Sequence, residues 1–370
     1  MQKKLLVLGC TGSIGCQTLD IVRRHPDRFA VCGLAAGKNQ SAVQELCKEF
    51  SCAGTVFSRD GMEGIAHLVG TCGADMAVNG ISGSAGLEPS LCVLENGMDL
   101  ALANKETVVM AWPLVQKTAA RTGASIVPVD SEHSAIFNMI HDIGAGNISG
   151  VVITASGGPF REYTTEQLKH VTMADALKHP TWRMGPKITV DSASLANKGL
   201  EVIEAVRLFS LQAEQVQVVV HPQSLVHSLV RTKDGMLYAQ ISDPDMRHPI
   251  FGALVWPDHE RNALPPFDLA GHTMTFFPPR FDDFPLLSLA YDCAKKDGAY
   301  PLAFNAANEV AVQAFMDGSL SFIQIAECVK EVLRSDWSMQ LDSLDAIRSA
   351  DRKARICADT FVRTAGRTKP

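Results

Sequence analysis

The chain opens with LLVLGCTGSIG at residues 5–15, and this stretch decides the first part of the fold. The four apolar residues from Leu5 to Leu8 are typical of a parallel strand that is buried on both faces. A glycine-rich turn follows and leads into helical spacing up to Arg24. Glycines let the backbone approach a pyrophosphate, and the N–H groups of a helix N-terminus bind it. The stretch predicts a dinucleotide-binding turn. Its GxxGxxG spacing differs from the usual GxGxxG, so an ordinary strand–helix turn is the alternative.

Outward from this turn, strand-like and helix-like segments alternate over the first 130 residues. Such alternation implies right-handed crossovers and a parallel sheet covered by helices on both faces. Ligands of such sheets bind at the carboxyl ends of the strands. We expect strands at 5–8, 31–35, 76–81, 100–103 and 125–129, and helices at 14–24, 87–94 and 107–121.

The pattern changes at residue 151 to a mixture of strands and helices. The Pro-rich stretch 258–284 lacks periodicity and is expected to be a linker. We predict an α/β fold that combines a Rossmann-like nucleotide-binding domain (1–130), a central α+β catalytic domain (131–257), the linker (258–284) and a C-terminal helical domain (285–370). Expected strands of the central domain lie at 151–154, 187–190, 216–220, 225–231 and 236–242, with a helix at 194–209; later helices lie at about 286–296, 302–316, 321–334 and from 343.

The composition restricts the class of protein. With 34 basic and 40 acidic residues among 370, the net charge is -6, and 46% of the residues are hydrophobic. These values are typical of a soluble globular chain and exclude collagen-like, disordered and disulfide-scaffold classes. The negative balance argues against nucleic acid or an anionic membrane as a partner. No apolar run approaches the ~20 residues of a membrane span. The ten cysteines are scattered without a CxxC, so we expect reduced, mostly buried thiols in the cytoplasm.

Polar residues follow two of the expected strands. Strand 31–35 leads to Gly37, Lys38 and Asn39, where an NAD site usually carries an acid for the ribose 2′-hydroxyl. A cation without an acid there favours the 2′-phosphate of NADP. Strand 100–103 leads to Asn104-Lys105-Glu106, which faces the cofactor side of the sheet. We prefer a binding role for this tripeptide over a plain surface loop.

Asp130-Ser131-Glu132 follows the strand at 125–129. In an extended chain residues i and i+2 point to the same side, so the two carboxylates would lie together. A hard divalent cation such as Mg²⁺ or Mn²⁺ suits them because it prefers oxygen ligands. A solvated pair or a salt bridge explains this motif equally well.

Asp191-Ser192 is expected to end the strand at 187–190 and to precede a helix. Asn197, Lys198 and Glu201 share one face of that helix by their i,i+3 and i,i+4 spacing. They indicate a phosphate site with Glu201 as a third metal carboxylate, or else a common intrahelical ion pair.

Two loops complete the candidate site. Ser156-Gly157-Gly158-Pro159 leaves a strand and offers N–H groups and a hydroxyl to an anion. Residues 176–186 include two X-Pro steps, so we expect a loop. Trp182 either packs passively on the surface or belongs to a lid that closes over substrate with Gly185 as hinge. We expect His227 to be an interior histidine.

These motifs occur together in one order along the chain: GCTGSIG (9–15), ANKE (103–106), PVDSEH (128–133), SGGPFR (156–161), NKGLE (197–201), HPQS (221–224) and FNAANE (304–309). In this combination the chain resembles the 1-deoxy-D-xylulose 5-phosphate reductoisomerases, from its first strand to its last helices. The stretch between Ser58 and Met76 is shorter than in some members and lies away from the motifs.

The resemblance implies conversion of 1-deoxy-D-xylulose 5-phosphate to 2-C-methyl-D-erythritol 4-phosphate in non-mevalonate isoprenoid biosynthesis. It also implies NADPH, a divalent cation and a homodimer. The matched metal positions are Asp130, Glu132 and Glu201, which with Lys105 are the expected catalytic residues. The matched NADPH positions are Thr11, Gly12, Ser13, Ile14, Gly37, Lys38, Asn39, Asn104, Glu106 and Gly185. The matched substrate positions are Lys105, Ser131, Ser156, His179, Trp182, Ser192, Asn197, Lys198 and Glu201.

Two other functions compete with this one. A semialdehyde or homoserine-type dehydrogenase shares such a first domain but needs no three convergent carboxylates. A semialdehyde dehydrogenase also needs a nucleophilic cysteine, and none lies between Cys92 and Cys293. A non-catalytic dinucleotide sensor would have no use for metal carboxylates or a lid.

Overall fold

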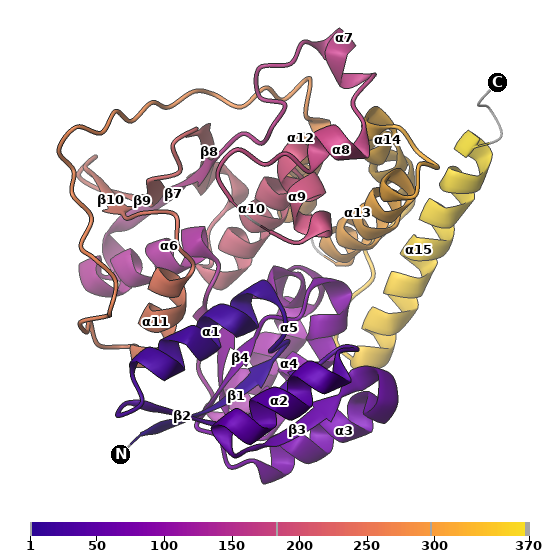
Figure 1. Cartoon of the computed structure of the whole chain (residues 1–370). Helices are drawn as coiled ribbons and strands as arrows, with labels where there is room; N and C mark the ends of the chain where they lie inside the picture. The colour runs from indigo at the N-terminus through magenta and orange to yellow at the C-terminus, as the bar shows by residue number, and fades with distance from the viewer. Residues whose placement is uncertain (1, 183, 297, 367–370) are drawn as a thin grey trace. The chain divides into compact units, whose positions relative to one another are not determined.

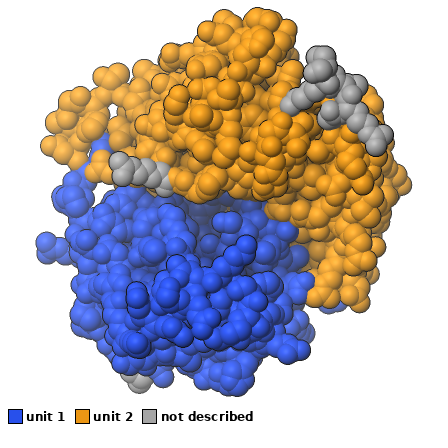
Figure 2. Space-filling view, turned by 45° about the vertical axis from the view of Figure 1, so that its right-hand side comes forward, with its two compact units in different colours: residues 1–107, 115–137, 245–267 blue, residues 108–114, 138–244, 268–370 orange. Residues whose placement is uncertain are grey.

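The structure is a computed structural model that describes residues 2–182, 184–296 and 298–366. Its contacts divide the chain into two compact units, coloured separately in Figure 2. Unit 1 comprises Met1–Thr107, Val115–Phe137 and Asp245–Phe267; unit 2 comprises Val108–Leu114, Asn138–Pro244 and Asp268–Pro370. The four-part division expected from the sequence stays a prediction. Position 183 of the expected lid, and 297 and 367–370 of the expected C-terminal domain, lie outside the described residues.

Unit 1 is built on a six-stranded parallel sheet with the order β3-β2-β1-β4-β5-β6. Leu5 to Leu8 of the central strand β1 are fully buried, as a strand covered on both faces requires. The strand order reverses between β1 and β4, which is where such sheets bind ligands. The strands are β1 (Lys3–Leu8), β2 (Phe29–Ala36), β3 (Ala53–Val56), β4 (Met76–Asn79), β5 (Asp99–Leu102) and β6 (Ile126–Pro128).

The helices of unit 1 bury one apolar face each against this sheet. In α1 the buried side includes Leu19, Ile21 and Val22. A late segment, α11, returns to this core, and its Phe251 meets Phe29 of β2 edge to face, with ring centroids 6.1 Å apart. Figure 1 shows α11 beside α1. The helices are α1 (Ser13–Arg24), α2 (Gln40–Phe50), α3 (Phe57–Thr71), a 3-10 turn η1 (Gly83–Gly86), α4 (Leu87–Glu95) and α11 (Arg247–Val255); α5 (Lys105–Thr122) and α6 (Ser131–Ile143) contribute to both units.

Unit 2 contains a four-stranded mixed sheet and most of the later helices. The sheet order is β10-β9-β7-β8, with β7 parallel to β8 and the other pairs antiparallel. Helix α13 is buried nearly all round and packs against α14 and α15 (Figure 1). The elements are η2 (Ala145–Asn147), β7 (Ile148–Ala155), α7 (Thr165–Leu168), α8 (Met173–Ala176), α9 (Pro186–Ala193), α10 (Ala196–Leu208), η3 (Ala213–Gln215), β8 (Val216–Val220), β9 (Val226–Thr232), β10 (Leu237–Ile241), α12 (Pro285–Lys295), α13 (Tyr300–Met316), α14 (Phe322–Val332) and α15 (Leu344–Gly366).

Most expected elements are confirmed, including the strands at 225–231 and 236–242 and the four late helices. The strand expected at 187–190 is wrong, because these residues lie in helix α9. The β-branched run Ile188-Thr189-Val190 suggested a strand, but Pro186 at the first helical position starts a helix. The expected burial of the cysteines is also wrong in part. All ten are free thiols, but only Cys10, Cys293 and Cys328 are buried.

In the part of the chain that the structure describes, no helix combines the length and the hydropathy that crossing a membrane requires.

Candidate active site

The glycine-rich turn lies between β1 and α1, at the carboxyl edge of the parallel sheet. A Cβ on Gly15 would lie 2.3 Å from the Gly9 carbonyl oxygen, so only glycine permits this close crossing of helix and turn. Gly12 is the N-cap of α1, no side chain caps the helix, and its first turn carries no acid. The N-terminus is therefore open to an anion, as a dinucleotide site requires. Thr11, Ser13 and Ile14 lie in this turn and the first turn of α1.

The second predicted nucleotide contact follows β2. Gly37, Lys38 and Asn39 are exposed, and the Asn39 side chain caps α2 by accepting from Ala42 N–H. Lys38 makes no ion pair among the described residues. The cation expected at this strand end is thus present and available.

Asn104 is buried and caps helix α5, so the alternative of a plain surface loop is wrong. Its amide nitrogen donates to the carbonyl oxygens of Ile81 and Gly83, both at 2.8 Å, and to Glu106 at 3.0 Å. Its side-chain oxygen accepts from Thr107 N–H at 3.0 Å. The Asn104 side chain therefore links the segment after β4 to the start of α5, and its role in cofactor binding stays a prediction.

Asp130 follows β6 and forms an ion pair with Lys105 at the start of α5. Burial alone would raise the pKa of Asp130, but the Lys105 ammonium and the nearby His133 hold it well below its ordinary range. Glu132 lies in the first turn of α6, and its N–H donates to Asp130 at 3.3 Å. The extended-chain argument for this pair is therefore wrong. The two residues are neighbours because a helix starts between them.

The Glu132 carboxylate also accepts a hydrogen bond from the adjacent Ser131 hydroxyl at 2.6 Å. Ser131 is itself buried in the first turn of α6. The hydroxyl expected to contact substrate thus lies against an expected metal carboxylate.

Glu201 is buried on α10 and confirms the shared face expected from its spacing. Lys198 pairs with Glu201 Oε2, and the Asn197 amide donates to Glu201 Oε1 at 2.6 Å. Both partners of the ion pair have side chains at most 5% exposed. This is a buried ion pair rather than the common, weak pair of a solvated helix face.

The expected metal ligands are distributed over the two units. Asp130 and Glu132 belong to unit 1 and Glu201 to unit 2, so their convergence on one ion stays a prediction. The donor set fits a hard cation, because all three residues offer carboxylate oxygens. In addition, Asp130 and Glu201 are each balanced by an ammonium group of the protein.

Three of the expected substrate residues meet within unit 2. His179 Nε2 lies 3.1 Å from Ser156 Oγ and 3.0 Å from Ser192 Oγ. His179 Nδ1 accepts from the backbone N–H groups of Thr181 and Trp182, so the neutral ring carries its proton on Nε2. Sequence spacing did not reveal this cluster.

The neutral state of His179 has a physical cause. Burial, with a smaller contribution from the charge of Arg161, lowers its pKa to about 4. Gly158 makes the close approach possible, because a Cβ there would lie 2.8 Å from the Ser192 carbonyl oxygen. Two hydroxyls and an imidazole N–H together form a polar cradle that suits phosphate or hydroxyl oxygens.

Trp182 lies in the loop between α8 and α9, as expected. Its side chain is only partly buried, and its ring centroid lies 6.3 Å from that of His227. His227 is an interior residue bonded to Ser242 Oγ at 2.9 Å, as expected. Gly185 is the exposed N-cap of α9, with a φ of -64° that does not itself require glycine. Its roles as hinge and NADPH contact stay predictions.

The sequence did not indicate what holds Ser192 in place. The preceding Asp191 is buried, pairs with Lys187 at 2.9 Å, and accepts from the Asn308 amide at 2.8 Å. The only signal was the FNAANE motif at 304–309, which places Asn308 on α13.

Comparison with known proteins identifies the family. The model described as "1-deoxy-D-xylulose 5-phosphate reductoisomerase" matches residues 5–61 and 54–112. The model described as "1-deoxy-D-xylulose 5-phosphate reductoisomerase C-terminal domain" matches residues 126–209, and the one described as "DXP reductoisomerase C-terminal domain" matches residues 241–357.

Individual relatives agree over the full length. The chain is 47% identical to the 1-deoxy-D-xylulose 5-phosphate reductoisomerase of Treponema denticola over 367 residues, 96% of each chain. It is 48% identical to that of Treponema pallidum over 366 residues, 97% of each chain.

Solved structures of this kind share the fold. The reductoisomerase of Zymomonas mobilis in complex with NADPH has a TM-score of 0.90 and 36% identity, covering 98% of this chain and 100% of that one. A reductoisomerase in complex with NADPH, fosmidomycin and magnesium has a TM-score of 0.89 and 35% identity, covering 98% of both chains. The chain therefore belongs to the 1-deoxy-D-xylulose 5-phosphate reductoisomerase family.

Proposed function

We propose that this chain converts 1-deoxy-D-xylulose 5-phosphate to 2-C-methyl-D-erythritol 4-phosphate, an early step of non-mevalonate isoprenoid biosynthesis, using NADPH and a divalent cation. The full-length similarity to reductoisomerases carries the proposal. The reaction rearranges a ketose skeleton to an aldehyde and then reduces it. When bound, the cation polarises the substrate carbonyl and NADPH supplies the hydride.

The residues of unit 1 serve the cofactor and the cation. The uncapped start of α1 and the turn at 9–12 would bind the pyrophosphate of NADPH, and the exposed Lys38 would supply a cation for its 2′-phosphate. Asp130 and Glu132, with Glu201 of unit 2, would hold the cation, because each offers carboxylate oxygens. Lys105, whose ammonium pairs with Asp130, would donate to a substrate oxygen.

The residues of unit 2 bind the substrate phosphate. Ser156, Ser192 and the Nε2–H of His179 form hydrogen bonds to phosphate oxygens, and Asn197 and Lys198 add an amide and an ammonium. His179 stays neutral at pH 7, so it donates one proton without adding charge. Binding energy from the remote phosphate orients the reacting end of the substrate.

The loop at 176–186 closes over the bound substrate and excludes water from the reactive intermediate. Trp182 is suited to this because its ring is large, has few rotamers and is only partly buried. Its backbone N–H bond to His179, at 2.8 Å, links the loop to the phosphate cluster.

Activity is tested by mixing the protein with NADPH, Mg²⁺ and 1-deoxy-D-xylulose 5-phosphate and following the nicotinamide absorbance. We expect NADPH to be consumed, the reaction to stop when a chelator is added, and activity to return with Mg²⁺ or Mn²⁺. When NADH replaces NADPH, kcat/KM should be much lower. Comparison with a Glu201→Gln variant separates this chemistry from contaminating reductases. If the folded protein, supplied with the divalent cation, forms no 2-C-methyl-D-erythritol 4-phosphate, the proposal is wrong.

We further propose that the chain acts as a homodimer in the cytoplasm. The edge strand β10 exposes Leu237 and Tyr238 by nearly half, and Met236 beside it by 59%. An exposed apolar sheet edge is a template for pairing with another chain, and a second copy supplies the same edge. A Tyr238→Lys variant should sediment as a monomer, whereas unchanged sedimentation would count against this edge.

A further inference from the structure

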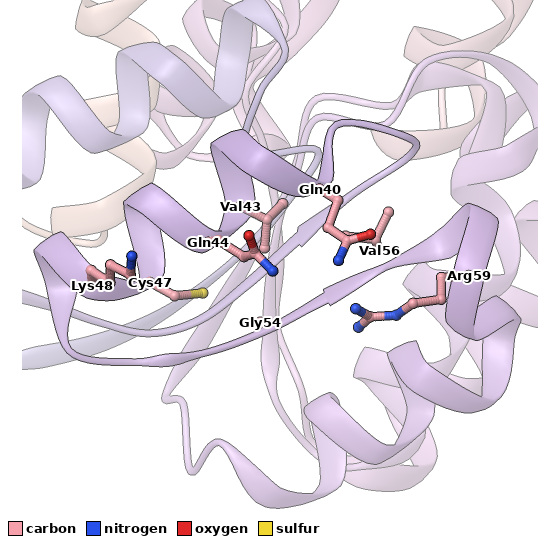
Figure 3. A pocket seen from close by; sticks show the side chains of 8 residues that line it. All are labelled: Gln40, Val43, Gln44, Cys47, Lys48, Gly54, Val56 and Arg59. Atoms are coloured by element: carbon pink, nitrogen blue, oxygen red, sulfur yellow. The ribbon is translucent and has the colours of Figure 1, made fainter.

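Unit 1 has a pocket of about 470 Å³ between helix α2, strand β3 and the start of α3 (Figure 3). Val43, Val56 and Cys47 form apolar parts of its wall, and Lys48 and Arg59 lie toward opposite ends (Figure 3). Arg59 belongs to none of the motifs that identify the family. The full lining is Gln40, Val43, Gln44, Cys47, Lys48, Gly54, Val56 and Arg59.

The Arg59 end of the pocket lies beside the expected ribose site. Strands β2 and β3 are parallel neighbours that end in register, with Ala36 paired to Val56. Beyond them, Ser58 N–H donates to the Gly37 carbonyl at 2.9 Å, which ties the two strand exits together. Arg59 therefore follows directly after the residue that contacts the 37–39 turn.

Positive potential gathers at this strand exit. Lys38 is exposed without an ion pair in the described part of the chain, and the first turn of α2 contains no acid. The helix N-terminus adds its own partial positive charge. The Asp60 carboxylate pairs directly with Arg59, so the bonds that Asp60 makes decide what the site can bind.

Asp60 is already saturated by local partners. Its Oδ1 accepts from Arg59 Nε at 2.6 Å, and its Oδ2 accepts from Arg59 Nη2, Thr55 Oγ1 and Val56 N–H at 2.7, 2.8 and 3.1 Å. These bonds leave Asp60 poorly placed to accept a ribose hydroxyl, as an NAD site would need. They also hold the guanidinium in one orientation, with the two N–H groups of Nη1 unused by any described residue.

We propose that Arg59 donates hydrogen bonds from Nη1 to the 2′-phosphate of NADPH and acts with Lys38 as a specificity-determining residue against NADH. The inference rests on the proposed function, since it concerns the same cofactor. A guanidinium that is pre-oriented by a carboxylate loses little entropy when it meets a phosphate, and charge-assisted bonds of this kind are strong. The neighbouring Asp60 reduces the net charge, so the effect of Arg59 is moderate rather than absolute.

The test is direct binding of NADPH and of NADH to the full chain without substrate, measured by calorimetry. Arg59→Gln should weaken NADPH binding about tenfold, the value of one charge-assisted hydrogen bond, and leave NADH binding unchanged. Lys48→Gln is the matched control. Lys48 is an exposed cation of the same pocket, but it lies about 12 Å along α2 from Gln40, so it should change neither affinity.

The outcomes separate the inference from the proposed function. If wild type binds NADPH and turns over but Arg59→Gln binds NADPH as tightly, the inference is wrong and the function stands. Equal weakening of NADPH and NADH would also overturn it, because a general disturbance of the pocket then explains the loss. If wild type does not bind NADPH, the proposed function itself fails. Arg59→Lys keeps the positive charge but lacks the planar array of N–H donors of a guanidinium, so its NADPH affinity should be intermediate. Wild-type NADPH affinity in that variant would contradict a role for the guanidinium geometry.

Discussion

Replacing Lys198 by Met tests the buried ion pair at the predicted metal carboxylate. Met is nearly isosteric with the lysine stem but carries no charge, so the change removes the ammonium and leaves Glu201 buried. Breaking a buried pair in this way costs about 3–5 kcal/mol. At about 2–4 °C per kcal/mol for a unit of this size, the melting temperature of unit 2 should fall by about 6–20 °C in the presence of a chelator. The remaining Asn197 bond to Glu201 favours the lower half of that range.

Magnesium should restore much of this loss. If Glu201 binds the cation as predicted, the cation would compete with the Lys198 ammonium in wild type, whereas the carboxylate of Lys198→Met would have no competing ammonium. A cation at a hundredfold excess over its Kd adds about 2.7 kcal/mol of stability. The shift in melting temperature on adding Mg²⁺ should therefore be larger in the variant than in wild type.

The assay is differential scanning calorimetry of both proteins, with chelator and with Mg²⁺. Lys178→Met is the matched control, because Lys178 also pairs with an acid three residues away, at 3.0 Å, but its side chain is 73% exposed. The control should melt as wild type does. Wild-type melting of Lys198→Met in chelator would refute the buried-pair reasoning, and equal Mg²⁺ shifts would refute the metal role of Glu201.

Three further predictions use the same protein. Trp182→Ala should change the melting temperature little while lowering substrate affinity and kcat/KM, because its ring is only partly buried; a large loss of stability with kcat/KM intact would refute the lid. Glu132→Gln should keep the fold but need a much higher Mg²⁺ concentration for activity, since an amide is a weaker ligand for a hard ion; full activity in chelator would contradict this. His179 has its pKa lowered to about 4 from a reference of about 6.5, so protonation favours the unfolded chain. Its contribution to stability is full above pH 6.5 and falls as the pH drops toward 4. His179→Asn should flatten that part of a stability–pH curve, and an unchanged slope would show that another group titrates there.

Local sequence was sufficient wherever a local rule decides structure. The buried run Leu5 to Leu8 and the glycine-rich turn predicted a parallel strand and an open helix N-terminus, and both are present. Helical spacing predicted that Asn197, Lys198 and Glu201 share a face, and they form the expected bonds. Two local rules conflicted at 187–190, where β-branched residues suggested a strand but Pro186 at the first helical position starts α9.

The sequence by itself determined the parallel sheet, the family motifs and the residue types of the candidate site, because strand burial, turn glycines and helix periodicity are properties of short segments. Only the tertiary structure decided that Ser156, His179 and Ser192 meet, that Asn308 supports Asp191, and that Arg59 stands beside the 37–39 turn. These contacts join segments up to 117 residues apart. Their proximity depends on which strands and helices pack as neighbours, which no local pattern encodes.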